Sequence, residues 1–205
     1  MLTADLVRVD FALIPADPLF GAVITASQVI TGEFSYNANV IDAGTFPPHL
    51  SLLICTIPRA ALAAVTADLE VLAAAGLPDI AALTVEPSGS GYVMLTVQRT
   101  AELTAFQDAI LDVATRARSG LGGDPFGRRY IRSSFAPHIS LAKIDRNDQN
   151  AAVAIGQRTL RGPRIARSQA LDLCDIGDRS QRWDILARYP ASNDPQAGGS
   201  TSFAG

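Results

Sequence analysis

The sequence predicts an α+β fold, and this prediction rests on the order of its hydrophobic patterns. Segments with strand-like alternation and segments with helical spacing follow one another in the order β-α-β-β-α, which is typical of α+β proteins. The chain has 205 residues, of which 48% are hydrophobic, so it is long enough to bury one substantial core or two small lobes. We therefore expect a globular protein in which helices pack against a sheet.

The expected strands are runs with apolar alternation and many β-branched or aromatic residues. The first, over residues 5–14, ends at Pro15. The second, over residues 47–57, is led in by two prolines, which fits a first strand position or an edge strand. The other expected strands cover residues 81–86, 91–98, 137–144, 170–176 and 183–189.

Apolar residues at spacings of three and four predict the helices. One helix covers residues 17 to about 31, another begins near Thr100, and a short one is expected near residues 148–157. Between the first two lies a helix with Pro58 in its first turn and Gly76 after its last turn. The apolar stripe that should face the sheet consists of Leu62, Val65, Leu69 and Leu72.

Three segments lack a regular pattern. Residues 33–46 show no clear period, and their role stays open. Residues 119–136 form a loop with four glycines that is too long for a simple connector, and long ordered loops are often functional. Residues 191–205 are rich in Gly, Ser, Asn and Gln, so we expect a disordered tail after a single domain over residues 1–190.

The sequence also argues against a membrane protein and against a cysteine framework. No stretch approaches the roughly 20 uncharged apolar residues that a membrane helix needs. Asp5, Arg8 and Asp10 make the N-terminus unlike a signal peptide, so we expect a soluble cytoplasmic protein. Cys55 and Cys174 lie in apolar strand-like runs, which favours small buried residues over a disulfide or a zinc site.

The net charge of −3 hides an uneven distribution. Residues 1–127 hold 5 Arg against 13 Asp and Glu, a net −8, whereas residues 128–167 hold 8 Arg and 1 Lys against 2 Asp, a net +7. Such a block suggests a local anionic ligand rather than long duplex nucleic acid, although chance clustering in a solvated loop gives the same count. Arg128 and Arg129 are therefore candidate substrate-binding residues. The arginines that recur every three residues across Arg158–Arg167 should align along an extended segment, either to follow a phosphate backbone or to keep a loop soluble.

A motif that occurs twice is the most informative feature of the sequence. The run Pro-His-Leu-Ser-Leu around His49 returns as Pro-His-Ile-Ser-Leu around His138, and these two histidines, the only ones in the chain, are 138 − 49 = 89 residues apart. Residues i and i+2 of a strand share a face, so His49 and Ser51 point one way while the leucines anchor the other face. His138 and Ser140 repeat this arrangement.

Each of these residues also has a less specific interpretation. An isolated histidine in an apolar strand is more often a hydrogen-bonded structural residue than a catalyst, but two histidines with the same neighbours favour a shared function. Tyr92 would either stack on a base or be a half-buried strand tyrosine. Lys143 faces away from His138 by strand alternation, unless the strand bulges.

The two motifs resemble those of the two-histidine phosphoesterase superfamily, which includes cyclic phosphodiesterases and bacterial proteins called RNA 2′,5′-ligase-like. The resemblance spans roughly residues 5–190 and rests on His49-Leu50-Ser51-Leu52 and His138-Ile139-Ser140-Leu141. It implies a two-lobed α+β fold with pseudo-twofold symmetry, an antiparallel sheet with helices in each lobe, one motif per lobe and a cleft between the lobes. We expect the protein to be a monomer.

The chemistry of the motifs fits transfer at phosphorus. Imidazoles with a pKa of about 6.5 suit in-line displacement, because one can remove a proton while the other protonates the leaving oxygen. Which of His49 and His138 is the base stays open, and no metal or other cofactor is required. Ser51 and Ser140 would bind the phosphate by donating hydrogen bonds to its non-bridging oxygens.

The sequence thus predicts a metal-independent phosphodiesterase. Its substrate would be a small nucleotide or RNA end: a 2′,3′-cyclic nucleotide, an RNA-end phosphate or a 2′,5′-phosphodiester. The alternative is a non-catalytic module that binds RNA ends or nucleotides on the same fold. A purely structural role would leave the repeated motif unexplained.

Overall fold

The computed structural model describes residues 5–34, 41–119, 134–161, 165–177 and 182–191. Its strands are β1 (Leu6–Pro15), β2 (Leu50–Pro58), β3 (Ile80–Pro87), β4 (Tyr92–Val97), β5 (His138–Lys143), β6 (Ile165–Ala166), β7 (Ser168–Asp175) and β8 (Asp184–Pro190). They form one sheet in the order β6-β3-β4-β5-β2-β1-β7-β8, in which neighbouring strands are antiparallel. The helices are α1 (Leu19–Glu33), α2 (Leu62–Ala74), α3 (Ala101–Ala117) and α4 (Gln149–Thr159). The predicted α+β class is confirmed.

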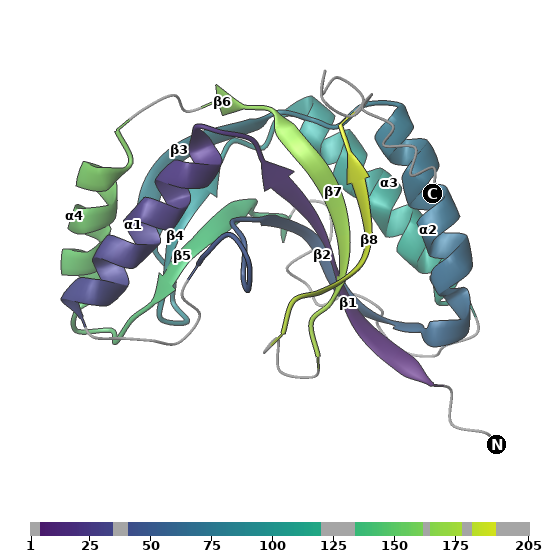
Figure 1. Cartoon of the computed structure of the whole chain (residues 1–205), viewed down its shortest axis with the longest axis horizontal. Coiled ribbons are helices and arrows are strands. Elements are labelled where there is room, and N and C mark those ends of the chain that lie inside the picture. Colours follow the sequence, from purple (N-terminus) through teal and green to yellow (C-terminus); the bar gives the residue numbers. More distant parts are fainter. Residues whose placement is uncertain (1–4, 35–40, 120–133, 162–164, 178–181, 192–205) are drawn as a thin grey trace, which may run out of the picture.

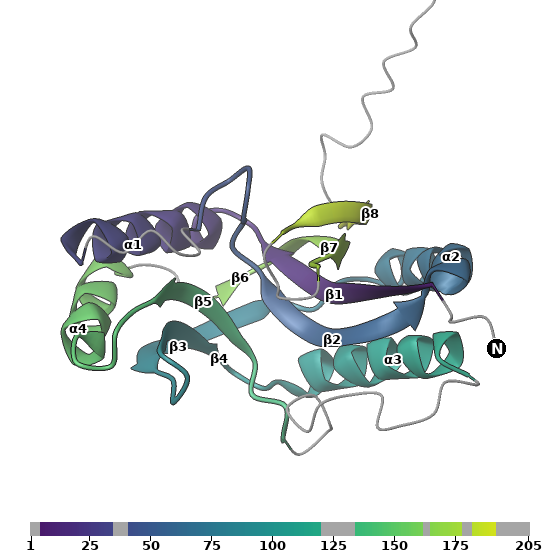
Figure 2. The same cartoon turned by 90° about the horizontal axis from the view of Figure 1, so that it is seen from below.

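The sheet divides into two lobes that meet at its centre. The β4 lobe contains β6, β3, β4 and β5 with helices α1 and α4, and the β1 lobe contains β2, β1, β7 and β8 with helices α2 and α3. Figure 1 shows the sheet arching between these two pairs of helices, and Figure 2 shows the pairs at opposite ends of the molecule. The central strands β2 and β5 are registered at one position only, Leu50 opposite Ile139.

Two helices, α1 and α3, each follow a strand of one lobe in the chain but pack against the other lobe. Helix α1 follows β1 in the chain but packs against β5 and α4 of the β4 lobe. Helix α3 follows β4 but packs against β2 and α2 of the β1 lobe. One apolar core runs through both lobes, with Phe11, Leu52 and Leu141 among its fully buried side chains.

The helices begin close to where the sequence places them. Helix α3 starts after Thr100, whose side chain accepts the backbone N–H of Leu103 at 3.1 Å, a cap that stabilises a helix by about 1 kcal/mol. Helix α2 buries Val65 and Leu69 as expected, and Gly76 follows it with a φ of +116°. The expectation for Pro58 was wrong.

Pro58 is the last residue of β2 rather than part of the first turn of α2. Its ψ of 134° is extended, and a 3-10 turn over Arg59–Ala61 separates it from the helix. The proline therefore ends the strand, because a ring that lacks an N–H suits the end of a ladder as well as the start of a helix.

Two segments add elements that the sequence did not reveal. The short strand β6 pairs with β3, Ile80 opposite Ala166. Within residues 33–46, Asp42 Oδ1 accepts the backbone N–H groups of Gly44 at 2.7 Å and Thr45 at 2.5 Å, which forms a tight turn. In the part of the chain that the structure describes, no helix combines the length and apolar character needed to cross a membrane.

Candidate functional site

A cleft of about 930 Å³ lies where the two lobes meet. Both predicted motifs line it, the first from the β1 lobe and the second from the β4 lobe, and Tyr92 lines it from β4. The lining residues from the two motifs are His49, Ser51, His138 and Ser140. The structure therefore brings together residues that are 89 positions apart in the chain, whereas Arg128 and Arg129 lie outside the described residues.

The pairing of β2 with β5 sets the relative positions of the motifs. Leu50 and Ile139 are opposite each other, and each directly follows its histidine. In an antiparallel pair, this register puts His49 on the side of Ser140 and His138 on the side of Ser51. Each imidazole thus lies toward the hydroxyl of the other motif, which is the pseudo-twofold arrangement that the resemblance implied.

Both histidines are anchored in the same way by their own backbone. Nδ1 of His49 is 2.8 Å from the carbonyl oxygen of Pro47, and Nδ1 of His138 is 2.9 Å from that of Ala136. Because a carbonyl oxygen can only accept, Nδ1 of each ring carries the hydrogen. In the neutral ring, Nε2 is then the nitrogen with a lone pair, so it is the atom that can take up a proton.

His49 lies in an apolar environment. Its ring centroid is 4.2 Å from that of Trp183 and 5.4 Å from that of Phe46, and its side chain is 11% exposed. Burial lowers the pKa of His49 to about 4; the bond to the Pro47 carbonyl partly opposes this shift, and the charge of His138 adds to it. His49 is therefore neutral at physiological pH and available as a base.

Asp10 of β1 is a site residue that the sequence interpretation missed. The residue is 1% exposed; Oδ2 accepts the hydroxyl of Ser51 at 2.6 Å and lies 4.0 Å from Nε2 of His49. Burial raises the pKa of Asp10 to about 7, against the opposing effects of the Ser51 hydrogen bond and the Arg8 charge. Alternation along β1 could have identified it, because Arg8 and Asp10 interrupt an apolar strand at i and i+2.

Arg8 was also missed as a site residue. It lines the cleft from β1, and it is the only Lys or Arg among the lining residues that the structure describes. A guanidinium at this position can bind a phosphate in bidentate fashion. The indole Nε1 of Trp183 is buried and has no hydrogen-bond partner in the described part of the chain, so it is a further donor at the edge of the cleft.

Tyr92 is half-buried. The pairing of its strand with β5 brings Lys143 to the same face, which strand alternation alone did not predict. The register between β4 and β5 shifts between Val93 opposite Ala142 and Met94 opposite Ser140, which leaves an extra residue in β5. The bulge moves Lys143 opposite Tyr92, with Nζ 5.6 Å from the centroid of the tyrosine ring. Strand alternation alone had placed this lysine on the other face.

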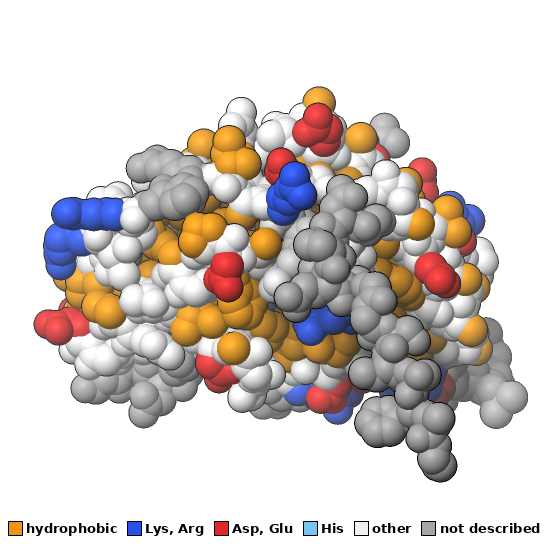
Figure 3. Space-filling view, turned by 45° about the horizontal axis from the view of Figure 1, so that its top comes forward, with side chains coloured by type: hydrophobic (Ala, Val, Ile, Leu, Met, Phe, Trp, Pro, Cys, Tyr) orange, Lys and Arg blue, Asp and Glu red, His pale blue; other side chains and the backbone are white. Residues whose placement is uncertain are grey.

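Arg158, Arg161 and Arg167 do not line the cleft, and Arg164 lies outside the described residues. The expected extended row was wrong for Arg158. That residue lies in the last turn of helix α4, while Arg161 follows the helix and Arg167 separates β6 from β7. All three are exposed. Figure 3 shows basic side chains at the end of the molecule where α4 lies, away from the centre of the sheet.

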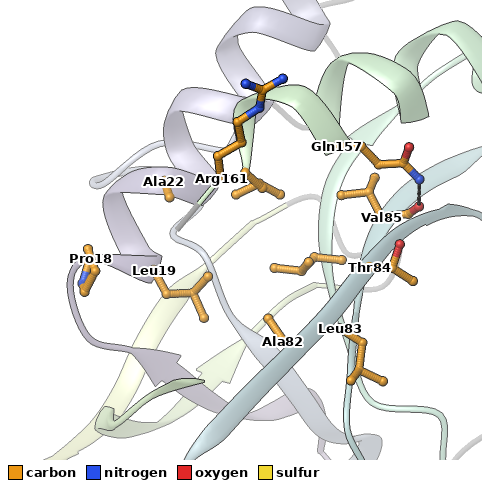
Figure 4. A pocket seen from close by; sticks show the side chains of 11 residues that line it. Pro18, Leu19, Ala22, Ala82, Leu83, Thr84, Val85, Gln157 and Arg161 are labelled. Atoms are coloured by element: carbon orange, nitrogen blue, oxygen red, sulfur yellow. Dashed lines mark hydrogen bonds between the residues drawn. The ribbon is translucent and has the colours of Figure 1, made fainter. Parts of the chain in front are cut away.

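A second pocket, of about 340 Å³, lies between α1, α4 and β3. Figure 4 shows its mostly apolar lining, with the Gln157 side chain donating to the Val85 carbonyl oxygen at 3.1 Å. The described residues that line it include no histidine, cysteine, aspartate or glutamate. It therefore lacks the groups for acid/base chemistry.

The cysteines are free and buried, as predicted. Burial raises the pKa of the Cys55 thiol to about 12 and raises that of Cys174 as well. A thiol held in its neutral form is a poor nucleophile and a poor metal ligand. Neither cysteine is a candidate for the chemistry of the cleft.

A family model matches much of this chain, and several solved structures are similar to it. Residues 33–163 match the family model of the 2′-5′ RNA ligase superfamily. Among solved structures, E. coli LigT complexed with phosphate is similar at 16% identity and a TM-score of 0.50, covering 92% of this chain and 99% of LigT. LigT complexed with ATP matches over the same shares at 15% identity and a TM-score of 0.50. Kluyveromyces marxianus Usb1 with uridine monophosphate matches at 12% identity and a TM-score of 0.46, over 89% of this chain and 97% of Usb1. The search of curated proteins gives no match.

Proposed function

The chain belongs to the 2′-5′ RNA ligase superfamily, and we propose on this basis that it is a metal-independent phosphodiesterase for small nucleotides or RNA ends. The observation that carries the proposal is the pair of imidazoles in one cleft, each held through Nδ1 by a backbone carbonyl. Such anchoring leaves Nε2 of both rings for proton transfer. The substrate would be a 2′,3′-cyclic nucleotide, an RNA-end phosphate or a 2′,5′-phosphodiester.

The environments of the two histidines support different roles. We assign His49 as the general base, because its lowered pKa keeps it neutral. It would accept a proton from the attacking water, or from a ribose hydroxyl, as the new P–O bond forms. His138, which is half-buried, would enter the reaction protonated and give its proton to the ribose oxygen as the old P–O bond breaks.

Hydrogen-bond donors around the histidines would hold the phosphate. Ser140 and Ser51 lie beside the histidine of the opposite motif, where a hydroxyl can donate to a non-bridging oxygen as charge builds on it. Arg8 would bind the same phosphate or a second one, and Tyr92 would contact the base. The crystallised LigT complexes hold phosphate and ATP, and we extend this class of ligand to the present cleft. A monomer in the cytoplasm stays a prediction.

Turnover in the presence of EDTA tests the proposal. Purified protein is incubated with 2′,3′-cyclic AMP and with a 2′,5′-linked dinucleotide, and the products are separated by chromatography. His49→Ala and His138→Ala should each lower kcat by at least ~100-fold, the usual contribution of a general acid or base. Arg158→Ala, a change on the exposed end of α4, serves as the matched control and should leave kcat unchanged.

Two results would contradict the proposal. The first is activity that EDTA abolishes and zinc or manganese restores. The second is a folded histidine variant with the specific activity of the unmodified protein, since this would make the histidine structural. Binding of these nucleotides without any turnover would favour the non-catalytic module instead.

A further inference from the structure

The two motifs are alike in sequence, but their neighbours differ. Ser51 donates its hydroxyl to Oδ2 of Asp10, a residue of the adjacent strand β1. On the other side, β4 supplies Met94 opposite Ser140. The pseudo-twofold symmetry of the two motifs is therefore broken at this position, where Ser51 has a carboxyl partner and Ser140 has a methionine opposite it.

The hydrogen-bond capacity of Ser51 makes this carboxyl group important. A serine hydroxyl has one proton to donate, and Ser51 donates it to Asp10. While that bond exists, Ser51 offers an incoming phosphate only its lone pairs, and it cannot act as a donor. If Asp10 is protonated, its own O–H can donate to Ser51 Oγ, and the Ser51 proton becomes available to the phosphate.

We propose that Asp10 is a positioning residue whose protonation directs the Ser51 hydroxyl to the bound phosphate, so that the anion and one proton bind together. The inference rests on the proposed function in requiring that a phosphate binds between the two motifs. One proton from solvent binds to the Asp10 carboxylate. Asp10 then donates a hydrogen bond to Ser51, and Ser51 donates one to a non-bridging oxygen of the phosphate.

The surroundings of Asp10 favour this proton uptake. Its Oδ1 is buried without a hydrogen-bond partner among the described residues, so the charged form is poorly stabilised. On its own strand Arg8 lowers the pKa of Asp10, and His49, which directly precedes β2, is held neutral by burial. The net result is a carboxyl group with a pKa of about 7, which changes protonation in the physiological range.

Among the described residues, the other ionisable groups around Asp10 do not compete for this role. On β7, Cys174 is opposite Asp10, and on β2 Cys55 lies nearby; burial raises the pKa of both thiols and keeps them neutral. The buried carboxylate of Asp172, farther along β7, accepts two hydrogen bonds from Arg188, at 2.7 and 2.6 Å. Among these groups, Asp10 is therefore the one that takes up a proton when the anion binds.

Sulfate is a suitable probe because it is a tetrahedral dianion that does not titrate near neutral pH. With a pKa of about 7, about nine-tenths of Asp10 is protonated at pH 6 and about one-tenth at pH 8. Sulfate should therefore bind the unmodified protein about tenfold more weakly at pH 8 than Asp10→Asn, whose amide donates to Ser51 at any pH. At pH 6 the two proteins should bind sulfate with similar affinity.

A double-mutant cycle separates this mechanism from simple charge repulsion. Sulfate affinity is followed by the fluorescence of Trp183, the single tryptophan, which lines the cleft. The tenfold gain from Asp10→Asn at pH 8 should disappear when Ser51 is alanine. It should persist when Ser140 is alanine, because no described carboxyl group is hydrogen-bonded to that serine; this variant is the matched control.

Calorimetric titration at pH 8, in two buffers of different ionisation enthalpy, measures how many protons the protein takes up when sulfate binds. The unmodified protein should take up nearly one proton more per bound sulfate than Asp10→Asn. Equal proton uptake, or a tenfold gain that survives in the Ser51→Ala background, would overturn the role of Asp10 and leave the proposed function intact. Absence of sulfate binding at both pH values in every variant would instead contradict the phosphate site itself, and the proposed function with it.

Discussion

Asp10 and His49 should affect the pH dependence of stability in opposite directions. The pKa of Asp10 rises on folding from 3.8 to about 7, so the folded state holds this proton more tightly than the unfolded state. Its contribution to the free energy of unfolding therefore falls by about 3 kcal/mol as pH rises from 4 to 7. The pKa of His49 falls from 6.5 to about 4, so its contribution rises by about 3 kcal/mol between pH 4 and 6.5.

In the unmodified protein these two contributions largely cancel, and replacing either residue should reveal the other. Asp10→Asn should gain stability relative to the unmodified protein by about 3 kcal/mol between pH 4 and 7. His49→Asn, whose amide can still donate to the Pro47 carbonyl, should lose about 3 kcal/mol relative to it between pH 4 and 6.5.

Urea unfolding, followed by the fluorescence of Trp183 at constant ionic strength, measures these differences. Ser140→Ala, a change that removes no titrating group, is the control and should give a curve parallel to that of the unmodified protein. The reasoning is refuted if the Asp10→Asn curve is also parallel between pH 4.5 and 7. Such a result would mean that Asp10 titrates alike in the folded and unfolded chain.

Two further predictions concern turnover. The pH profile of kcat/KM should be bell-shaped, because His49 must be neutral while His138 is protonated, and its acidic limb should lie near pH 4, the pKa of His49. The residual activity of His49→Ala should lack this limb, and an acidic limb that persists in this variant would contradict the assigned roles. Arg8→Gln should raise KM more than it lowers kcat, because a charged hydrogen bond to the phosphate is lost and the binding free energy weakens by about 1.5–3 kcal/mol. Arg158→Gln is the matched control. Equal effects of the two changes on KM would show that Arg8 does not bind the phosphate.

Much of the site could be predicted because it is encoded locally. A histidine and a serine at i and i+2 share a face of any strand, so the two hydroxyl–imidazole pairs follow from the sequence alone. The repeated motif also indicates that both pairs belong to one site. These signals need no knowledge of which strands are neighbours.

The surroundings of the histidines could not be predicted, because they depend on contacts between distant segments. Asp10 reaches Ser51 across 41 residues of sequence, and Trp183 reaches His49 from a segment near the end of the domain. These contacts depend on the order of strands in the sheet. The bulge that turns Lys143 toward Tyr92 also depends on the partner strand, so alternation within one strand gave the wrong face.

The exchange of helices between the lobes constrains how the chain can fold during synthesis. The β4 lobe receives α1 early but stays incomplete until α4 has emerged from the ribosome. The β1 lobe holds β1 between β2 and β7, and β7 comes later still. Neither lobe can therefore finish its core well before the other, in contrast to domains that fold one after another. A nascent chain ending before β7 would carry both histidine motifs, yet it would lack the strand that completes the sheet beside Asp10.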